Sequence, residues 1–581
     1  MTDVSVEGGL DEPTGLEPEQ GALRLVQPGD EHTQAEWESA AAAVLRKARR
    51  LREDDDDALV WPRLTRTTLD GVEVAPLGVP GLLDDVVTAG RPDGPGEWDV
   101  RAHLDLGTDP RADNEALLAD LEGGVTSLWL TAHDVEPDAV EWPAVLGGVL
   151  LDLAPVVLPG DAALAEAFLE QAEQTGQALH PRSNLGLDAR AATGEQAALA
   201  ADAGVLGFVV DATGVHDRGA SDVQELAWAM AAVATYLRRL AADGVDVARA
   251  AALVELRLAA TDEQFPTIAK LRAVRRLWHA VLEHSGVEQV PMRLHAVTSR
   301  PMMSRYDAYT NLLRTTVAAF AAGVSGADAV TVLPFDSPLG RPERLGRRLA
   351  RNTSALLVSE SHLARVVDPA GGAWAVEKLT DDLAVAAWRL FGELDESTDL
   401  DAAVDARIAE TVERRTAEIA TRRRPITGLT EFPVVDETLP ERAPSTGWDD
   451  VRPWGAAFEA LRDDPPRERV LLATLGTVAE HTARATFAAN LLAAGGIGAD
   501  AAGVTEGPDD LVAVHAGQPV AVLAGSDAAY EQWGEAAASA LREAGVRHVV
   551  VAGQPAEWAD DSCALGVDAH AFLTRTREAL S

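Results

Sequence analysis

The chain has 581 residues and a net charge of −43 at pH 7, so we expect two or three domains and a surface that repels nucleic acid and anionic lipid. No apolar run approaches the ~20 residues that a membrane-spanning helix needs, so no membrane association is predicted. Cys563 is the only cysteine, which excludes an intrachain disulfide and a cysteine-based metal site and fits a reducing cytoplasm.

The first 60 residues are expected to form an arm followed by a helix. Residues 1–30 are rich in Gly, Pro and acidic residues, which predicts a mobile arm, and they lack the basic-then-apolar pattern of an export signal. Residues 31–52 have the apolar spacing of a helix. Because an arm and a lone helix have little to pack on, we expect residues 1–60 to lie on a partner chain.

Residues 61–400 are predicted to form a (β/α)8 TIM barrel. The segment from 61 to 77 begins it as a short two-stranded element with a turn at Asp70–Gly71. From about Trp98, short apolar runs then alternate with long helices over roughly 300 residues, the pattern of a barrel, with a doubly wound sheet as the alternative. The strand candidates are Leu128–Leu130, Val149–Asp152, Gly207–Asp211, Leu253–Leu258, Met292–His295 and Ala329–Leu333.

The C-terminal part is predicted to be a linker and a second, smaller domain, so the fold class is α/β throughout. Residues 401–465 are expected to link the domains, since the stretch from 422 to 447 is polar, aperiodic and rich in proline. Residues 466–581 again alternate strand and helix, with clear strands at 470–473, 520–523 and 548–551. This alternation favours a flavodoxin-like, doubly wound domain.

The predicted helix from Phe265 to Leu282 is amphipathic, with its apolar residues on one face. Composition alone favours an outer barrel helix with a solvated basic side, and a phosphate site is the alternative. The basic residues are Lys270, Arg272, Arg275 and Arg276.

Two strand-end segments carry polar groups that could act in chemistry. Arg293 and His295 lie at the end of a predicted strand, where a barrel places its active site, and could hold a carboxylate or polarise a carbonyl. A structural histidine is the alternative. His216 lies in the loop after another strand. The sequence shows no nucleophile–base triad, no metal-ligand spacing and no Walker loop, so no metal is expected.

The stretch from Arg469 to Arg484 predicts a strand, a turn at Gly476 and a helix start that carries His481. Cobalamin-binding domains present their cobalt ligand on such a turn, in the pattern Asp-x-His-x-x-Gly. Here Ala479 replaces the Asp, which would orient the imidazole and raise its basicity. Arg484 replaces the Gly, which would let the nucleotide tail approach the backbone. The pattern therefore resembles a degenerate cobalamin site.

These stretches, in this order, resemble the cobalamin-dependent acyl-CoA mutases, and methylmalonyl-CoA mutase in particular. The family pattern Ile-Ala-Lys-Leu-Arg-Ala-Ala-Arg-x-Leu-Trp is similar to residues 268–278, and Leu-Arg-x-His-x-Gln-Thr-Ser-Gly is similar to residues 292–300. The block from Ile268 to Gly372 aligns essentially without gaps. Further matches within it are Asp307–Thr315, Phe335–Pro342, Ala350–Thr353 and Asp368–Gly372. Weaker similarity extends from about Glu36 to the C-terminus.

The departures from the family fall on its chemistry. Val297 and Arg300 replace the Gln and Gly of the Gln-Thr-Ser-Gly loop, and His103 stands where a catalytic mutase places a Tyr beside the reacting carbon. His216 matches the His of the family's Gly-Tyr-His, but the loop after it is shortened. The loop that receives the cobalamin nucleotide falls at residues 572–575, without glycine. If the register is anchored on Gly476, the ligand position falls on Glu480 and the site is lost as well.

The resemblance therefore implies the smaller, non-catalytic chain of heterodimeric methylmalonyl-CoA mutases. His103, His216, Arg293 and His295 would be vestigial site residues, and Gly476 and His481 a cofactor site that no longer functions. The implied partner is a homologous catalytic large subunit, which would hold adenosylcobalamin and act on acyl-CoA, while this chain holds no cofactor. The alternatives are an independently catalytic cobalamin-dependent mutase and a solitary module that binds acyl-CoA or cobalamin.

Overall fold

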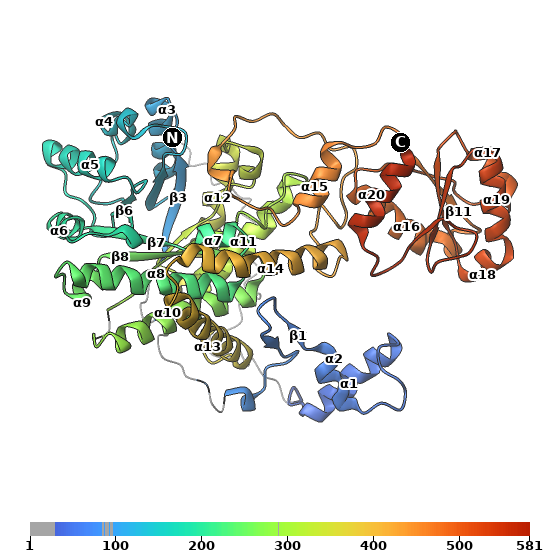
Figure 1. Ribbon diagram of the computed structural model, residues 1–581, viewed down its shortest axis with the longest axis horizontal. Coiled ribbons are helices and arrows are strands. Elements are labelled where there is room, and N and C mark those ends of the chain that lie inside the picture. Colours follow the sequence, from blue (N-terminus) through green and yellow to red (C-terminus); the bar gives the residue numbers. More distant parts are fainter. Residues whose placement is uncertain (1–28, 84–85, 87–91, 93–96, 289) are drawn as a thin grey trace, which may run out of the picture. The chain divides into compact units, whose positions relative to one another are not determined.

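The computed structural model describes residues 29–83, 86, 92, 97–288 and 290–581 (Figure 1). The chain divides into two compact units: residues up to 67 together with 73–77, and residues 68–72 together with 78–581. The expected mobile arm, residues 1–30, lies almost wholly outside the described residues. The first boundary thus falls within the hairpin that the sequence assigned to the barrel domain.

The first unit has a small core of its own. It contains α1 (Gln34–Lys47), α2 (Val60–Leu64) and the antiparallel pair β1 (Arg66–Thr67) and β2 (Glu73–Val74). A capping box between Thr33 and Glu36 begins α1. Ala42, Leu45, Leu51 and Val60 are buried together, and the rings of Trp37 and Trp61 lie 4.9 Å apart. Helix α1 thus packs on the short segment that follows it, and the expectation that residues 1–60 lie on a partner chain stays a prediction.

The second unit begins with a closed barrel of eight parallel strands, which confirms the predicted TIM barrel. Each strand pairs with the next along the chain, and β10 closes the barrel against β3. The strands are β3 (Asp99–Asp105), β4 (Ser127–Thr131), β5 (Val156–Val157), β6 (Asn184–Asp188), β7 (Leu206–Asp211), β8 (Val254–Ala260), β9 (Arg293–Thr298) and β10 (Ala329–Thr331).

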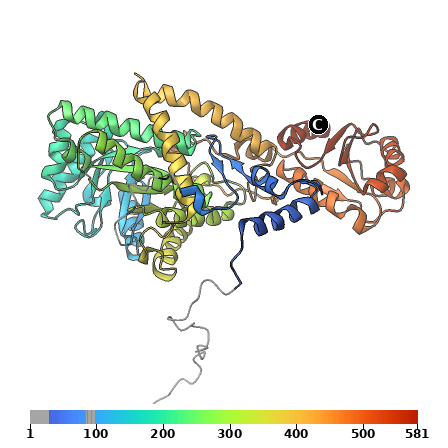
Figure 2. The same ribbon diagram turned by 90° about the horizontal axis from the view of Figure 1, so that it is seen from below.

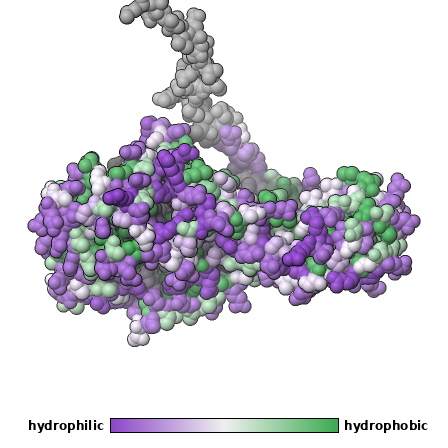
Figure 3. Space-filling view, turned by 90° about the horizontal axis from the view of Figure 1, so that it is seen from above, coloured by the Kyte–Doolittle hydropathy of each residue, from purple (hydrophilic) through white to green (hydrophobic). Residues whose placement is uncertain are grey.

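Helices that follow the strands form the outer layer of the barrel (Figure 1, Figure 2). They are α3 (Pro110–Glu122), α4 (Trp142–Val145), α5 (Ala162–Thr175), α6 (Gly194–Asp202), α7 (Thr213–Asp217), α8 (Asp222–Ala242), α9 (Val247–Ala251), α10 (Gln264–His284), α11 (Asn311–Val324), α12 (Arg344–Ala355) and α13 (Trp374–Asp395). Hydrophilic side chains cover much of the face in Figure 3, interspersed with apolar ones. In the described segments, no helix combines the length and apolarity that crossing a membrane requires.

Three barrel strands differ from the sequence prediction. Val149–Asp152 is a turn with Leu150 59% exposed, and the strand lies further on at Val156–Val157. The strands β3 and β6 were missed, because charged and amide side chains such as Arg101 and Asn184 are buried on them and interrupt the apolar run. A search for apolar runs cannot find a strand whose inward face is polar.

The prediction that α10 has a solvated basic side was also wrong. Lys270 and Arg272 are 0% and 3% exposed. The ammonium of Lys270 contacts Glu225 at 2.8 Å, and the guanidinium of Arg272 pairs with Asp368 and lies 3.0 Å from Glu377. Each cation is buried because a carboxylate on a neighbouring element meets it.

The C-terminal domain is a parallel sheet in the order β12-β11-β13-β14-β15, which is the flavodoxin-like order and confirms that prediction. Its strands are β11 (Val470–Thr474), β12 (Ala499–Ala501), β13 (Val520–Ala524), β14 (His548–Ala552) and β15 (Asp561–Cys563). Its helices are α16 (Val478–Ala494), α17 (Pro508–Val514), α18 (Asp527–Ala529), α19 (Glu535–Glu543) and α20 (Ala569–Leu580).

The expected linker, residues 401–465, is partly helical. Helix α14 (Leu400–Ala420) fills its first part and α15 (Ala456–Asp463) its last. Residues 421–455 between them have no α-helix or strand.

Candidate functional site

An ion pair crosses the interior of the barrel. Arg101 on β3 contacts Glu255 on β8 at 2.7 Å, and the two side chains are 0% and 1% exposed. Since β3 and β8 are not neighbours in the barrel, the pair spans the space between them. Arg101 also donates through Nε to the hydroxyl of Ser127 on β4, at 3.0 Å.

Above this pair, a layer of aromatic and basic side chains fills the barrel around Trp129 of β4. The ring of His103 lies 4.3 Å from the ring of Trp129, the guanidinium of Arg257 lies 4.1 Å from that ring, and His295 meets it edge-on at 5.4 Å. Arg257 also pairs with Asp211 at 2.7 Å. Four strands thus contribute side chains to one packed layer.

The hydrogen bonds fix the tautomer of both histidines. Arg257 can only donate, so Nδ1 of His295 accepts its hydrogen bond at 3.0 Å, and Nε2 carries the proton toward Thr331 Oγ1 at 2.7 Å. Thr131 donates to Asp105, so it accepts from Nε2 of His103 at 2.9 Å. Both protons are held by threonine hydroxyls within the barrel.

Burial keeps these imidazoles neutral. It lowers the pKa of His103 to about 3, and together with the nearby Arg101 and Arg257 it lowers the pKa of His295 well below its ordinary value. Neither side chain can act as a cationic acid near neutral pH.

The structure separates Arg293 from this layer. Arg293 is the first residue of β9 and so lies at the amino-terminal end of the barrel, opposite the end where barrel enzymes place their active sites. Its guanidinium lies 4.0 Å from Asp99 and 3.9 Å from Asp328. The expectation that Arg293 points into an active site was wrong, because the strand starts at this residue.

His216 belongs to a buried polar chain after β7. Its Nε2 lies 2.7 Å from Ser299 Oγ, and its Nδ1 lies 3.5 Å from a Glu225 carboxylate oxygen. Although burial opposes it, the ammonium of Lys270 lowers the pKa of Glu225. This serine–histidine–carboxylate alignment could not be predicted from the sequence, because its members lie far apart in the chain. Ser299 is 1% exposed and Trp454 lies against the His216 ring, so substrate has no access to it.

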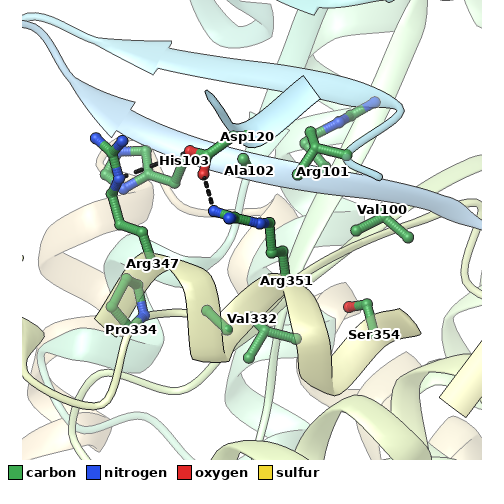
Figure 4. Close-up of a pocket in the computed structure, with 12 residues that line it drawn as sticks. Val100, Arg101, Ala102, His103, Asp120, Val332, Pro334, Arg347, Arg351 and Ser354 are labelled. Carbon is green, nitrogen blue, oxygen red and sulfur yellow. Dashed lines mark hydrogen bonds and ion pairs between the residues drawn. The ribbon is translucent and has the colours of Figure 1, made fainter. Parts of the chain in front are cut away.

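A small cavity of about 20 Å³ lies between β3 and α12 (Figure 4). In Figure 4, Arg347 and Arg351 reach toward Asp120, and the Arg351 contact measures 2.7 Å. The volume suits one water molecule and no substrate. Among the described residues, no group of three or more His, Cys, Asp or Glu side chains is arranged to hold a metal ion.

A wider groove of about 750 Å³ lies between residues 421–435 and α16. Its lining is largely apolar, and its Glu431 pairs with Arg422.

In the C-terminal domain, His481 lies inside the first turn of α16. Gly476 turns the chain with φ +82°, and Thr477 caps the helix, with its backbone N–H donating to Glu480 at 2.8 Å. This hydrogen bond lowers the pKa of the exposed Glu480 carboxyl and commits it to the cap. His481 is 7% exposed, and its buried Nδ1 has no hydrogen-bond partner among the described residues.

The carboxyl ends of β13 and β14 are closed by side chains of this chain. The hydroxyl of Tyr530 accepts from the backbone N–H of Gly525 at 3.0 Å and lies 2.8 Å from the carbonyl oxygen of Ala552. The guanidinium of Arg484 donates to the carbonyl of Gly525 at 2.7 Å and covers the Tyr530 ring at 5.0 Å.

Doubly wound sheets bind ligands outside their carboxyl ends, at the point where the strand order reverses. Here that point lies between β11 and β13, beside the Gly525 backbone. A cobalt ligand would need an exposed imidazole with an oriented partner, and a nucleotide tail would need open backbone. A buried His481 and the side chains of Arg484 and Tyr530 do not fit a cobalamin.

Comparison with known proteins agrees with the resemblance in the sequence. The family model described as "Methylmalonyl-CoA mutase" matches residues 207–492. The "Methylmalonyl-CoA mutase small subunit" of Streptomyces virginiae is 42% identical over 621 residues, covering 96% of this chain and 98% of that protein. The chain belongs to the methylmalonyl-CoA mutase family.

Other members of this family that are named as small subunits match over most of their length. The "Probable methylmalonyl-CoA mutase small subunit" of Mycobacterium tuberculosis (strain ATCC 25618 / H37Rv) is 38% identical over 90% of this chain and 92% of that protein. The "Methylmalonyl-CoA mutase small subunit" of Propionibacterium freudenreichii subsp. shermanii is 35% identical over 91% of this chain and 90% of its own. The predicted family is confirmed, and it is a family of isomerases.

Proposed function

We propose that this chain is a non-catalytic small subunit of a heterodimeric methylmalonyl-CoA mutase in the cytoplasm. Its partner would be a homologous large subunit, in which adenosylcobalamin supplies the radical for interconversion of methylmalonyl-CoA and succinyl-CoA. The role of this chain would be to pack against and rigidify that subunit, with residues 1–60 lying on the partner.

The observation that carries the proposal is the burial of His481. The residue that aligns with the cobalt ligand lies within a capped helical turn, and its nearest carboxylate neighbour in sequence, Glu480, serves the cap. The filled barrel supports the same conclusion from the other domain, because Trp129 and Arg257 occupy its interior. The names of the relatives from Streptomyces virginiae and Propionibacterium freudenreichii, both called small subunits, agree with it.

Co-expression with a longer homologue that retains Asp-x-His-x-x-Gly tests the proposal. The chain alone should show no corrinoid absorption and no mutase activity, and the mixed complex should show both. In the complex, His481→Ala should leave activity within about twofold, whereas the same change at the large subunit's cobalt ligand should abolish it. A large loss with His481→Ala would refute the proposal.

A further inference from the structure

Residues 443–454, which precede α15, run across the carboxyl end of the barrel. They contact the loops that follow four different strands, β4, β7, β9 and β10. Around the closed barrel, β9 and β10 lie between β4 and β7 on the side that also holds β3 and β8, so the segment joins loops from widely separated strands at this end. Barrel enzymes place their active sites at this end.

One end of the segment is held by Arg341, in the loop after β10. The backbone N–H of Arg341 donates to the carbonyl of Ala443 at 2.8 Å. Its guanidinium pairs with Asp134, after β4, at 2.8 Å, and the hydroxyl of Thr446 donates to the same carboxylate at 2.5 Å. A Cβ added to Gly447 would lie 3.0 Å from the ring of His133, so the segment packs closely on this loop.

The middle of the segment is held by Arg300, after β9. Its guanidinium donates to the carbonyl of Gly447 at 2.6 Å and forms an ion pair with Asp217, after β7. Burial raises the pKa of Asp217, and the neighbouring guanidinium of Arg300 opposes that shift. Arg300 stands where the mutase loop pattern has glycine, which could make neither contact.

The far end of the segment bonds to the barrel through its backbone. The N–H of Arg452 donates to the carbonyl of Asp217, and the N–H of Trp454 donates to the carbonyl of Pro301, both at 2.9 Å. The Trp454 ring lies 6.3 Å from the His216 ring and 5.4 Å from the guanidinium of Arg415. The polar chain of His216 and Ser299 is thereby sealed beneath the segment.

We propose that residues 443–454 are a built-in plug that closes this barrel to acyl thioesters, with Arg300 as its latch. The plug rests on the proposed function for the identity of the excluded ligand. The plug is distinct from the closed carboxyl ends of β13 and β14 around Gly525, because the plug lies on the barrel and those strands belong to the C-terminal domain.

Hydrogen exchange of the full chain tests the latch, because the amides of Arg452 and Trp454 report the plug directly. Arg300→Gly should speed exchange at both amides by at least about tenfold and leave the amides of α16 unchanged. Arg300→Lys, which keeps a charge for Asp217, should have a smaller effect. The control is Arg469→Gly, which removes an exposed pair with Asp500 and should change nothing at the plug.

Thiol labelling tests whether the plug closes the barrel. Ser299→Cys should react with iodoacetamide at least about tenfold faster when combined with Arg300→Gly than alone. Cys563 is 1% exposed and serves as the internal control, since its labelling should stay equally slow in both proteins.

The two proposals fail in different ways. Plug amides that exchange rapidly in the unaltered chain, or that do not respond to Arg300→Gly, would overturn the plug and leave the proposed function intact. Equal labelling of Ser299→Cys with and without Arg300→Gly would overturn it as well. A corrinoid spectrum from the chain alone would instead refute the proposed function, while the exchange rates would still decide the plug.

Discussion

Arg257 of β8 reaches across the barrel to lie over the ring of Trp129 of β4, with 4.1 Å between the guanidinium carbon and the ring centroid. These strands are not neighbours, so the contact occupies the barrel interior. Side chains from opposite strands are thus packed against each other inside the barrel.

The first prediction concerns that filling. Trp129→Ala should destabilise the chain by about 3–5 kcal/mol, because the surrounding side chains cannot collapse into the space of a buried indole. Thermal unfolding followed by circular dichroism measures the change. Trp374→Ala, at a 43% exposed tryptophan that begins α13, should cost much less. Equal effects of the two substitutions would contradict the packed interior.

The second prediction concerns the ion pair across the barrel. Glu255→Gln should cost about 3–5 kcal/mol in urea unfolding, because it leaves Arg101 as a buried charge without a counterion. The double change Arg101→Met with Glu255→Leu should recover most of the loss. The control Glu393→Gln breaks an exposed pair with Arg407 and should cost about 0.5 kcal/mol or less. A double variant as unstable as the single one would count against this account.

The third prediction concerns the buried cation of α10. Lys270→Met should destabilise by about 3–5 kcal/mol, since Glu225 loses the ammonium that compensates its burial. Lys378→Met is the matched control, because it removes a 36% exposed lysine that pairs with Asp382 four residues on. It should change stability by about 0.5 kcal/mol or less. A comparable loss of stability in both variants would contradict the larger contribution expected from the buried ion pair.

The fourth prediction is a pH dependence at Asp70. Burial raises the pKa of this carboxyl to about 6, with neighbouring Asp222 adding to the shift while hydrogen bonds from Ser221 and Val223 and the charge of Arg414 oppose it. A raised pKa means that the folded chain binds the proton more tightly than the unfolded chain. The stability that the protonated Asp70 carboxyl contributes to the folded chain is therefore fully present below about pH 4 and is lost as the pH rises through about 6.

Asp70→Asn removes this titration. Relative to the variant, the unaltered chain should lose about 1–2 kcal/mol of stability between pH 4 and pH 7, with no further change above. Melting temperatures of both proteins over this range give the difference, which cancels carboxylates that titrate in both. A difference that is flat with pH, or one of opposite sign, would contradict the raised pKa.

The two domains differ in how well the sequence predicted them. The strands Val470–Thr474, Val520–Ala524 and His548–Ala552 are buried on both faces, so each forms a continuous apolar run that can be found directly. In β3, the polar side chains of Arg101 and His103 interrupt the apolar run. A search for apolar runs therefore misses this strand. Period-two charges in Val254–Ala260, at Glu255 and Arg257, could have revealed a polar interior.

The sequence predicted which residues belong to the candidate site, but it did not predict which groups their side chains contact. The sequence identified His103 and His295, but it could not place Trp129 between them, because contacts across a barrel depend on which strands face each other. It found Arg300 as a departure from the family loop. Only the structure shows that this guanidinium reaches both Asp217 and the Gly447 carbonyl.

By itself the sequence determined the family and the two α/β domains, because these follow from local patterns. It also determined that Ala479 and Arg484 replace the Asp and the Gly that accompany the cobalt ligand in cobalamin-binding domains. The tertiary structure alone decided that charged side chains fill the barrel, that α10 buries its cations and that residues 443–454 cross the barrel's end. Each of these depends on pairs of groups far apart in the chain. Their burial is tolerable only when folding brings the opposite charge or hydrogen-bond partner within contact distance.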